Sequence, residues 1–145
     1  MCKPRKNESF ATWFKRLNLK NFSASEFTSY FEVTRRGVTN EAPPRELWEN
    51  IVPVIKVVDS LRDQLGKAIV INSSYRSEAY NKKCGGVRNS QHRYFRALDI
   101  SVAGVQPERV AALLRARRQA GEFKGGIGTY PTFVHIDCRG TNANW

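Results

Sequence analysis

Two short segments of the chain alternate between apolar and polar side chains, and each carries metal-binding side chains on its polar face. In residues 97–102 the bulky apolar side chains fall on one face of a strand, and Asp99 falls on the other. In residues 133–137, His135 and Asp137 share the face opposite the aliphatic residues. The pattern predicts two strands that present carboxylate and imidazole groups to one side of a sheet.

Apolar spacing elsewhere predicts helices and further strands. A long helix is expected between Pro43 and Gly66, with a kink at Pro53. Residues 34–42 are expected to form a loop. Shorter helices are expected at residues 10–17, after Ser23, at 78–83 and at 107–121, and further strands at 68–72 and 125–129. We therefore predict a single-domain α+β fold in which helices flank a small antiparallel sheet that carries the site.

Length and charge limit the classes of partner. A chain of 145 residues normally forms one domain. Its 24 Lys and Arg against 13 Asp and Glu give a net charge of +11, which favours polyanions such as nucleic acid, anionic lipid or an acidic cell-wall polymer. The chain contains no recognised nucleic-acid-binding motif, so a nucleic-acid partner rests on charge alone and is not expected. No apolar run is long enough for a membrane span.

The three cysteines, Cys2, Cys84 and Cys138, do not form a disulfide framework or a Cys-x-x-Cys pair. This usage is typical of a protein made in a reducing compartment. The basic N-terminus is followed by no apolar signal-peptide core, so synthesis in the cytoplasm without a signal peptide is expected. A cysteine hydrolase that pairs Cys84 or Cys138 with a histidine is an alternative interpretation.

The chain has only two histidines, His92 and His135. Taken singly, His92 is most simply an exposed loop residue and His135 a hydrogen-bonded strand residue. Together with Asp99 they supply two imidazoles and one carboxylate, which are good zinc donors. Three such ligands leave the fourth tetrahedral position for water, as in a catalytic rather than a structural zinc site.

The segments around these residues resemble the zinc D-alanyl-D-alanine metallopeptidases. That family includes D,D-carboxypeptidases, dipeptidases and phage endolysin peptidases, and it shares its fold with the hedgehog signalling domain. Ser90, His92, Ala97 and Asp99 match the family pattern Ser-x-His-x-x-Gly-x-Ala-x-Asp. The resemblance extends over about residues 21 to 140 and includes the stretches 71–77, 80–86, 125–128 and 133–137.

The resemblance implies a role for several residues. His92, Asp99 and His135 would hold one zinc ion. Arg76 would stabilise the oxyanion that forms on the substrate carbonyl. Ser90 would either bind substrate or brace its loop, and Tyr130 would either polarise the substrate or pack in a turn.

The general base is the role that the resemblance assigns least directly. Some branches of the family have a Glu three residues before the last zinc histidine, where this chain has Thr132. Others have a His two residues before it, where this chain has Phe133. The remaining acid on the same face is Asp137. It is expected to act as the base, or alternatively as a hydrogen-bond partner of a metal ligand.

Phe95 replaces the glycine of the family pattern. If that glycine takes a positive φ or permits close packing, Phe95 would require a different loop path.

The sequence leads to one functional hypothesis and one alternative. Residues 1–20 are expected to form a basic N-terminal segment, and residues 21–145 a zinc peptidase domain. The expected activity is hydrolysis of D-amino-acid peptide bonds in bacterial peptidoglycan, by a monomer acting as a carboxypeptidase or endopeptidase. A phage lysis enzyme, reaching the periplasm from the host cytoplasm, would suit the charge. The alternative is a non-catalytic, zinc-stabilised binding domain of the same fold.

Overall fold

Five strands form the central sheet, in the order β3-β4-β6-β5-β7. The computed structural model describes residues 2–145. The strands are β3 Ile69–Ser73, β4 Ala97–Val102, β5 Gly126–Thr129, β6 Val134–Asp137 and β7 Ala143–Asn144. All neighbouring pairs are antiparallel except β5 and β7, which are parallel. The α+β prediction is therefore confirmed, although β7 was not predicted.

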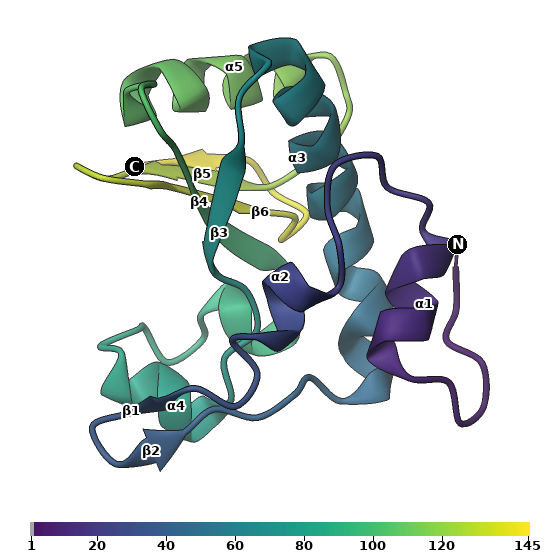
Figure 1. The fold of residues 1–145 in the computed structure, drawn as a ribbon. Coiled ribbons are helices and arrows are strands. Elements are labelled where there is room, and N and C mark those ends of the chain that lie inside the picture. The colour runs from purple at the N-terminus through teal and green to yellow at the C-terminus, as the bar shows by residue number, and fades with distance from the viewer. Residues whose placement is uncertain (1) are drawn as a thin grey trace.

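Helices lie on both sides of this sheet (Figure 1). Helices α3 and α5 pack on the face that carries Leu98, Ile100 and Val102, all of which are buried. The segment that contains α4 and η2 lies toward the opposite face. The helices are α1 Phe10–Arg16, α2 Ser25–Thr28, α3 Val52–Leu65, α4 Glu78–Lys83 and α5 Pro107–Gln119, and the 3-10 helices are η1 Arg45–Ile51 and η2 Gln91–Tyr94.

The alternation in β4 and β6 has the predicted structural consequence. In the antiparallel register, Asp99 lies directly opposite His135, and Ala97 lies opposite Asp137. Residues paired in this way place their side chains on the same face. Asp99, His135 and Asp137 therefore share the face that points away from α3 and α5.

The prediction of one long kinked helix was wrong at its N-terminal half. Residues Arg45–Ile51 form the 3-10 helix η1, and α3 begins only at Val52. Pro53 thus lies in the first turn of α3, where its missing N–H leaves no helical hydrogen bond unmade. Trp48 holds η1 in place, because its indole N–H donates to the Pro43 carbonyl at 2.9 Å.

Residues 34–42 also contain more structure than the predicted loop. Strands β1 Thr34–Arg35 and β2 Val38–Thr39 pair as a short antiparallel hairpin. Arg36 and Gly37 occupy its turn with φ values of 50° and 80°. Positive φ at both central residues is characteristic of a type I′ turn, whose twist matches that of the two strands it joins.

Helix α1 belongs to the main hydrophobic core. Trp13 is fully buried, and Phe10 and Phe14 pack with Phe27 of α2 at ring-centroid distances of 6.3 and 5.0 Å. The predicted helical stripe in residues 10–17 is therefore confirmed. A domain boundary at residue 20 stays a prediction, but the side chains before it pack against those after it.

Phe95 adopts the left-handed conformation itself, with φ 54° and ψ 43°. Its ring is fully buried and packs against Phe10, Phe27, Phe31 and Tyr75 at centroid distances of 6.1 to 6.4 Å. Aromatic packing thus offsets the strain of a positive φ at a residue with a Cβ. The tight turn between η2 and β4 is therefore formed although Phe95 replaces the family glycine.

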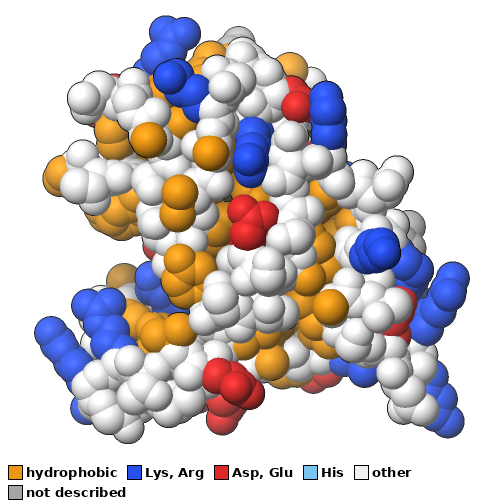
Figure 2. All heavy atoms as spheres, viewed as in Figure 1, with side chains coloured by type: hydrophobic (Ala, Val, Ile, Leu, Met, Phe, Trp, Pro, Cys, Tyr) orange, Lys and Arg blue, Asp and Glu red, His pale blue; other side chains and the backbone are white. Residues whose placement is uncertain are grey.

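Basic side chains are spread over the visible surface rather than gathered in one patch (Figure 2). Within residues 2–145, no helix is both long and apolar enough to cross a membrane.

Substitution of Phe95 tests whether aromatic packing offsets the strain of its positive φ. We expect Phe95→Ala to lower the free energy of unfolding by about 3–5 kcal/mol, because it removes a buried ring. Phe95→Gly should be less harmful by about 1 kcal/mol, because glycine relieves the left-handed strain. Urea denaturation of both variants measures the difference, and an alanine variant as stable as the glycine variant would contradict the assignment of strain to this residue.

Candidate metal centre and cleft

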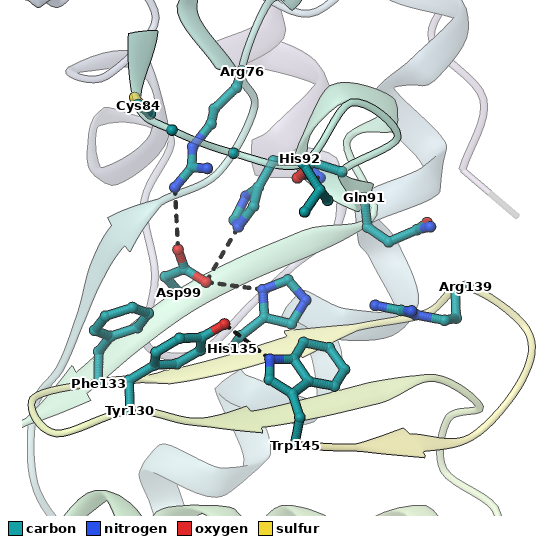
Figure 3. A pocket seen from close by; sticks show the side chains of 14 residues that line it. Arg76, Cys84, Gln91, His92, Asp99, Tyr130, Phe133, His135, Arg139 and Trp145 are labelled. Carbon is teal, nitrogen blue, oxygen red and sulfur yellow. Dashed lines mark hydrogen bonds and ion pairs between the residues drawn. The ribbon is translucent and has the colours of Figure 1, made fainter. Parts of the chain in front are cut away.

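His92, Asp99 and His135 converge from three elements on one point. His92 comes from η2, Asp99 from β4 and His135 from β6. One donor atom from each lies within 4.8 Å of the other two. Asp99 Oδ1 is 3.2 Å from His92 Nε2 and 3.0 Å from His135 Nδ1. All three residues are buried, and Figure 3 shows their side chains pointing toward one another.

The Ser74 carbonyl fixes the tautomer of His92. Nδ1 of His92 lies 2.6 Å from this oxygen, which can only accept a hydrogen bond, so Nδ1 carries the proton. Burial lowers the pKa of His92, which keeps the ring neutral. Its Nε2 therefore presents a lone pair to Asp99.

The carboxylate of Asp137 likewise orients the ring of His135. Asp137 Oδ2 accepts from His135 Nε2 at 2.7 Å, which turns Nδ1 toward Asp99. Burial opposes charge on this ring, but hydrogen bonds to Asp137 and Asp99 outweigh it and raise the pKa of His135. Burial would also raise the pKa of Asp99, yet its close contacts with His135 and His92 hold that pKa below its usual value.

This arrangement fits a metal ion. In the neutral tautomers, two imidazole lone pairs face one carboxylate oxygen at about hydrogen-bond distance, which is repulsive without a cation between them. Tetrahedral zinc with bond lengths near 2.0–2.1 Å separates its donor atoms by about 3.3 Å, close to the observed 3.0 and 3.2 Å. The second nitrogen of each histidine already has an acceptor, as is usual for metal-binding histidines.

Asp137 is completely buried and uses both carboxylate oxygens. Oδ1 accepts from the Gly126 amide at 2.9 Å and from Arg139, whose Nη2 also contacts Oδ2 at 2.6 Å. Burial would raise the pKa of Asp137, but these hydrogen bonds and the one from His135 lower it instead. The side chain therefore stays ionised and holds His135 in place.

Arg76 lies beside the three donors, and both its guanidinium and its backbone amide are hydrogen-bonded. Its Nη2 is 3.4 Å from Asp99 Oδ2, and its Nε donates to Ser73 Oγ at 3.0 Å. The Arg76 amide donates to the His92 carbonyl at 3.1 Å, so the guanidinium and His92 share one frame.

Asn40 braces this segment and was not predicted. Its Nδ2 donates to the Tyr75 carbonyl at 2.9 Å and to the Tyr30 carbonyl at 3.0 Å, while its Oδ1 accepts from the Ser77 amide at 2.9 Å. Asn40 is 2% exposed and lies 36 residues before Arg76 in the chain. Nothing in the local sequence marks it, because all its contacts are tertiary.

The donors lie at the floor of a cleft with a volume of about 320 Å³. One wall consists of Cys84 to Val87 and the η2 loop, and the other consists of Tyr130, Phe133 and Trp145 from the sheet. Figure 2 shows the molecule hollowed here, in the region that lies between the β5–β6 strands and the α4 segment in Figure 1.

Two further predicted residues also line the cleft. Ser90 Oγ accepts from the His92 amide at 3.3 Å, and the choice between substrate binding and bracing of this loop stays a prediction. Tyr130 lies in the turn between β5 and β6, where its ring stacks on Phe133 and its hydroxyl accepts from Trp145 at 2.8 Å. Thr132, the position of the family glutamate, is exposed and does not line the cleft.

Trp145 was not predicted from the sequence either. Its indole lies 5.3 Å from the His135 ring, and the guanidinium of Arg139 lies 5.1 Å from its centroid. The available signal was the pair Gly126 and Gly128 on one face of β5, since glycines in a strand often mark a close neighbour.

The two cysteines of the alternative hypothesis lie in different surroundings, and the observations that argue against a cysteine nucleophile concern Cys138. The Cys138 thiol points away from His135 and donates to the Asn50 carbonyl at 3.2 Å. Burial raises its pKa to about 11, so the reactive thiolate is scarce at neutral pH. Cys84 lines the cleft, where its sulfur lies 4.0 Å from Arg35 Nη1.

The fold and this centre define the class of a metal-dependent hydrolase: an α+β domain with a His-Asp-His donor set at the floor of a cleft. The sequence profile described as Peptidase M15 matches residues 20–137, and the chain belongs to this family of zinc-dependent peptidases. As a member of this family, it is a metallopeptidase. A comparison with curated proteins found no match.

Removal of the Asn40 side chain should loosen the Arg76 segment. We expect Asn40→Ala to lower the free energy of unfolding by about 2–3 kcal/mol, because two carbonyls and one amide lose a buried partner. Hydrogen exchange at the Ser77 amide should accelerate more than the global destabilisation explains. Asn72→Ala is the matched control, because Asn72 is exposed and bonds only to Ser101 Oγ at 3.1 Å. Unchanged exchange at Ser77 would contradict the bracing role.

Alkylation tests the protection of Cys138. With Cys2 and Cys84 replaced by serine, iodoacetamide at pH 8 should modify the folded chain at least about tenfold more slowly than the urea-unfolded chain. A pKa of about 11 leaves roughly 0.1% thiolate at that pH. Mass spectrometry over time gives both rates. Equal rates would restore Cys138 as a candidate nucleophile.

Proposed function

We propose that this chain is a zinc peptidase that hydrolyses D-amino-acid peptide bonds of bacterial peptidoglycan. The observation that carries the proposal is the convergence of two imidazole nitrogens on one carboxylate at the floor of a cleft. Membership of the peptidase M15 family supports the reaction type. The resemblance to D-alanyl-D-alanine peptidases and the net charge of +11 support an anionic cell-wall substrate.

His92 Nε2, Asp99 and His135 Nδ1 are the proposed ligands of one zinc ion. A bound zinc ion supplies Lewis acidity and lowers the pKa of water toward about 7. The Ser74 carbonyl and Asp137 keep the two imidazoles oriented so that the correct nitrogens face the ion.

Arg76 is the proposed donor to the substrate carbonyl. Ser73 anchors its Nε, and Nη2 reaches over the donor set to Asp99. A guanidinium held in this way donates to a carbonyl oxygen and stabilises the negative charge that develops on it as the bond is attacked.

The remaining predicted residues support this arrangement in different ways. Of the two roles open to Asp137, its burial and its contacts with His135 and Arg139 favour orientation of the ligand over proton transfer. Ser90 braces the His92 loop and also faces the cleft, and Tyr130 forms part of the cleft wall.

A non-catalytic zinc-binding domain is the second candidate. It is favoured by Thr132 and Phe133, which occupy the two positions where branches of the resembled family have a Glu or a His. Such a domain would bind zinc and peptide without turnover.

We further infer that the cut falls either at a terminal D-Ala or within a peptide crosslink, and that a monomer makes it. A phage lysis enzyme is the setting that we propose for a small domain of this charge. The product separates the two cuts, because a carboxypeptidase releases free D-Ala whereas an endopeptidase splits dimeric muropeptides.

Digestion of purified peptidoglycan tests the proposal. The zinc-loaded protein should release D-Ala or split crosslinks, and a chelator should abolish the reaction until zinc is restored. Elemental analysis should find about one zinc per chain. Bound zinc without any product would support the binding domain instead.

Three variants connect this reaction to the site. His135→Ala should lose both zinc and activity. Arg76→Ala should keep zinc but lose about 10²–10³ in kcat, the usual effect of removing one oxyanion donor. Asp63→Asn, an exposed acid far from the cleft, is the control and should change neither. An Arg76→Ala variant with wild-type kcat would remove Arg76 from the mechanism.

A further inference from the structure

Exposed apolar side chains gather at the cleft. Four large hydrophobic residues are exposed in the described part of the chain, and Val87, Tyr130 and Trp145 among them line the cleft. The fourth, Val70, lies on β3 outside it. Exposed apolar groups that converge on one concave site indicate a binding surface.

Tyr130, Phe133 and Trp145 form a rigid wall on the sheet side, here called the aromatic wall (Figure 3). The Tyr130 and Phe133 rings stack with centroids 4.5 Å apart and an interplanar angle of 5°. Trp145 Nε1 donates to the Tyr130 hydroxyl at 2.8 Å. The wall is thus built before any ligand arrives, so that binding would require little further ordering of these side chains.

The backbone of the sheet holds Trp145 in this position. The Thr129 amide donates to the Trp145 carbonyl at 2.8 Å, and the Trp145 amide donates to the Ile127 carbonyl at 3.1 Å. A Cβ on Gly128 would lie 2.5–3.0 Å from indole atoms, and a Cβ on Gly126 would lie 2.8–2.9 Å from them. The two glycines of β5 therefore provide the space in which the indole lies.

The aromatic wall reaches the metal centre. The Trp145 ring lies 5.3 Å from the ring of His135, a proposed zinc ligand. Arg76 and Arg139 are the charged side chains at the two ends of the cleft, and Asp99 is the acid among its lining residues. A substrate side chain beside the reacting carbonyl would meet aromatic surface between two arginines, each of which is paired with an aspartate.

We propose that Tyr130, Phe133 and Trp145 form a specificity subsite for an apolar side chain adjacent to the scissile bond. The subsite disfavours a cationic side chain there, because the two nearby carboxylates, Asp99 and Asp137, are already paired with Arg76 and Arg139, so that the cation would lose water without gaining a free counter-charge. Trp145 is its specificity-determining residue, and it lies beyond the stretch matched by the family profile. The inference rests on the proposed peptidase function and adds the residues that select the substrate side chain.

Paired peptides test the subsite. Acetylated tripeptides that end in D-Ala-D-Ala are compared with versions that carry glycine or D-Lys at either of the last two positions. The wild-type zinc enzyme should prefer D-Ala at one position and reject D-Lys there. Trp145→Ala should raise KM for the D-Ala peptide about tenfold, as the loss of an aromatic anchor commonly does. Its preference over glycine should shrink, while zinc content stays at the wild-type value.

Two further variants control this result. Val70→Ala removes the exposed apolar side chain outside the cleft and should leave KM unchanged. Trp145→Phe keeps a ring but loses the bond to Tyr130, so its KM should lie between those of the wild type and Trp145→Ala. Thermal melts of each variant show that it is folded. An active Trp145→Ala enzyme with wild-type KM and wild-type side-chain preference would overturn the subsite.

Failure of the proposed function gives a different result. If the zinc-loaded wild type cleaves none of these peptides, the peptidase proposal fails. Calorimetric titration with acetyl-D-Ala-D-Ala then decides the subsite. Binding that is lost in Trp145→Ala supports it, and absence of binding to the wild type, or binding that Trp145→Ala retains, overturns it.

Discussion

Asp99 on β4 and His135 on β6 face each other across two antiparallel strands, so the register of this pair sets the distance between two metal donors. A slip of one residue would move one of them to the face covered by α3 and α5, where apolar side chains belong. The buried aliphatic residues that alternate with these donors therefore fix the register and, with it, the site. The third donor, His92, depends on a loop, which needs other means of support.

That support comes from backbone contacts of the loops around β3 and η2. The Ser74 carbonyl sets the tautomer of His92, and the Arg76 amide binds the His92 carbonyl. Asn40 in turn holds the peptide groups on both sides of Arg76. The proposed carbonyl donor and one proposed zinc ligand thus move together, which preserves the geometry that a tetrahedral reaction requires.

The sequence predicted those parts of the site that depend on local periodicity or on rare residue types. Alternation in 97–102 and 133–137 placed Asp99 and His135 on one face, and the scarcity of histidine pointed to His92. Asn40 and Trp145 could not be found in this way, because their roles consist entirely of contacts with distant segments. The helix predicted through Pro53 was wrong in its first half, since a proline that interrupts a periodic pattern can equally begin a helix.

The environment of Phe95 explains why a family glycine could be lost without loss of the turn. Positive φ at this position costs about 1–2 kcal/mol for a residue with a Cβ. Burial of a phenylalanine ring contributes more than that, provided that the surrounding pocket is aromatic and complete. Phe10 of α1 is part of that pocket. The N-terminal helix therefore supports the turn that follows His92, which links the first 20 residues to the proposed metal centre through hydrophobic packing.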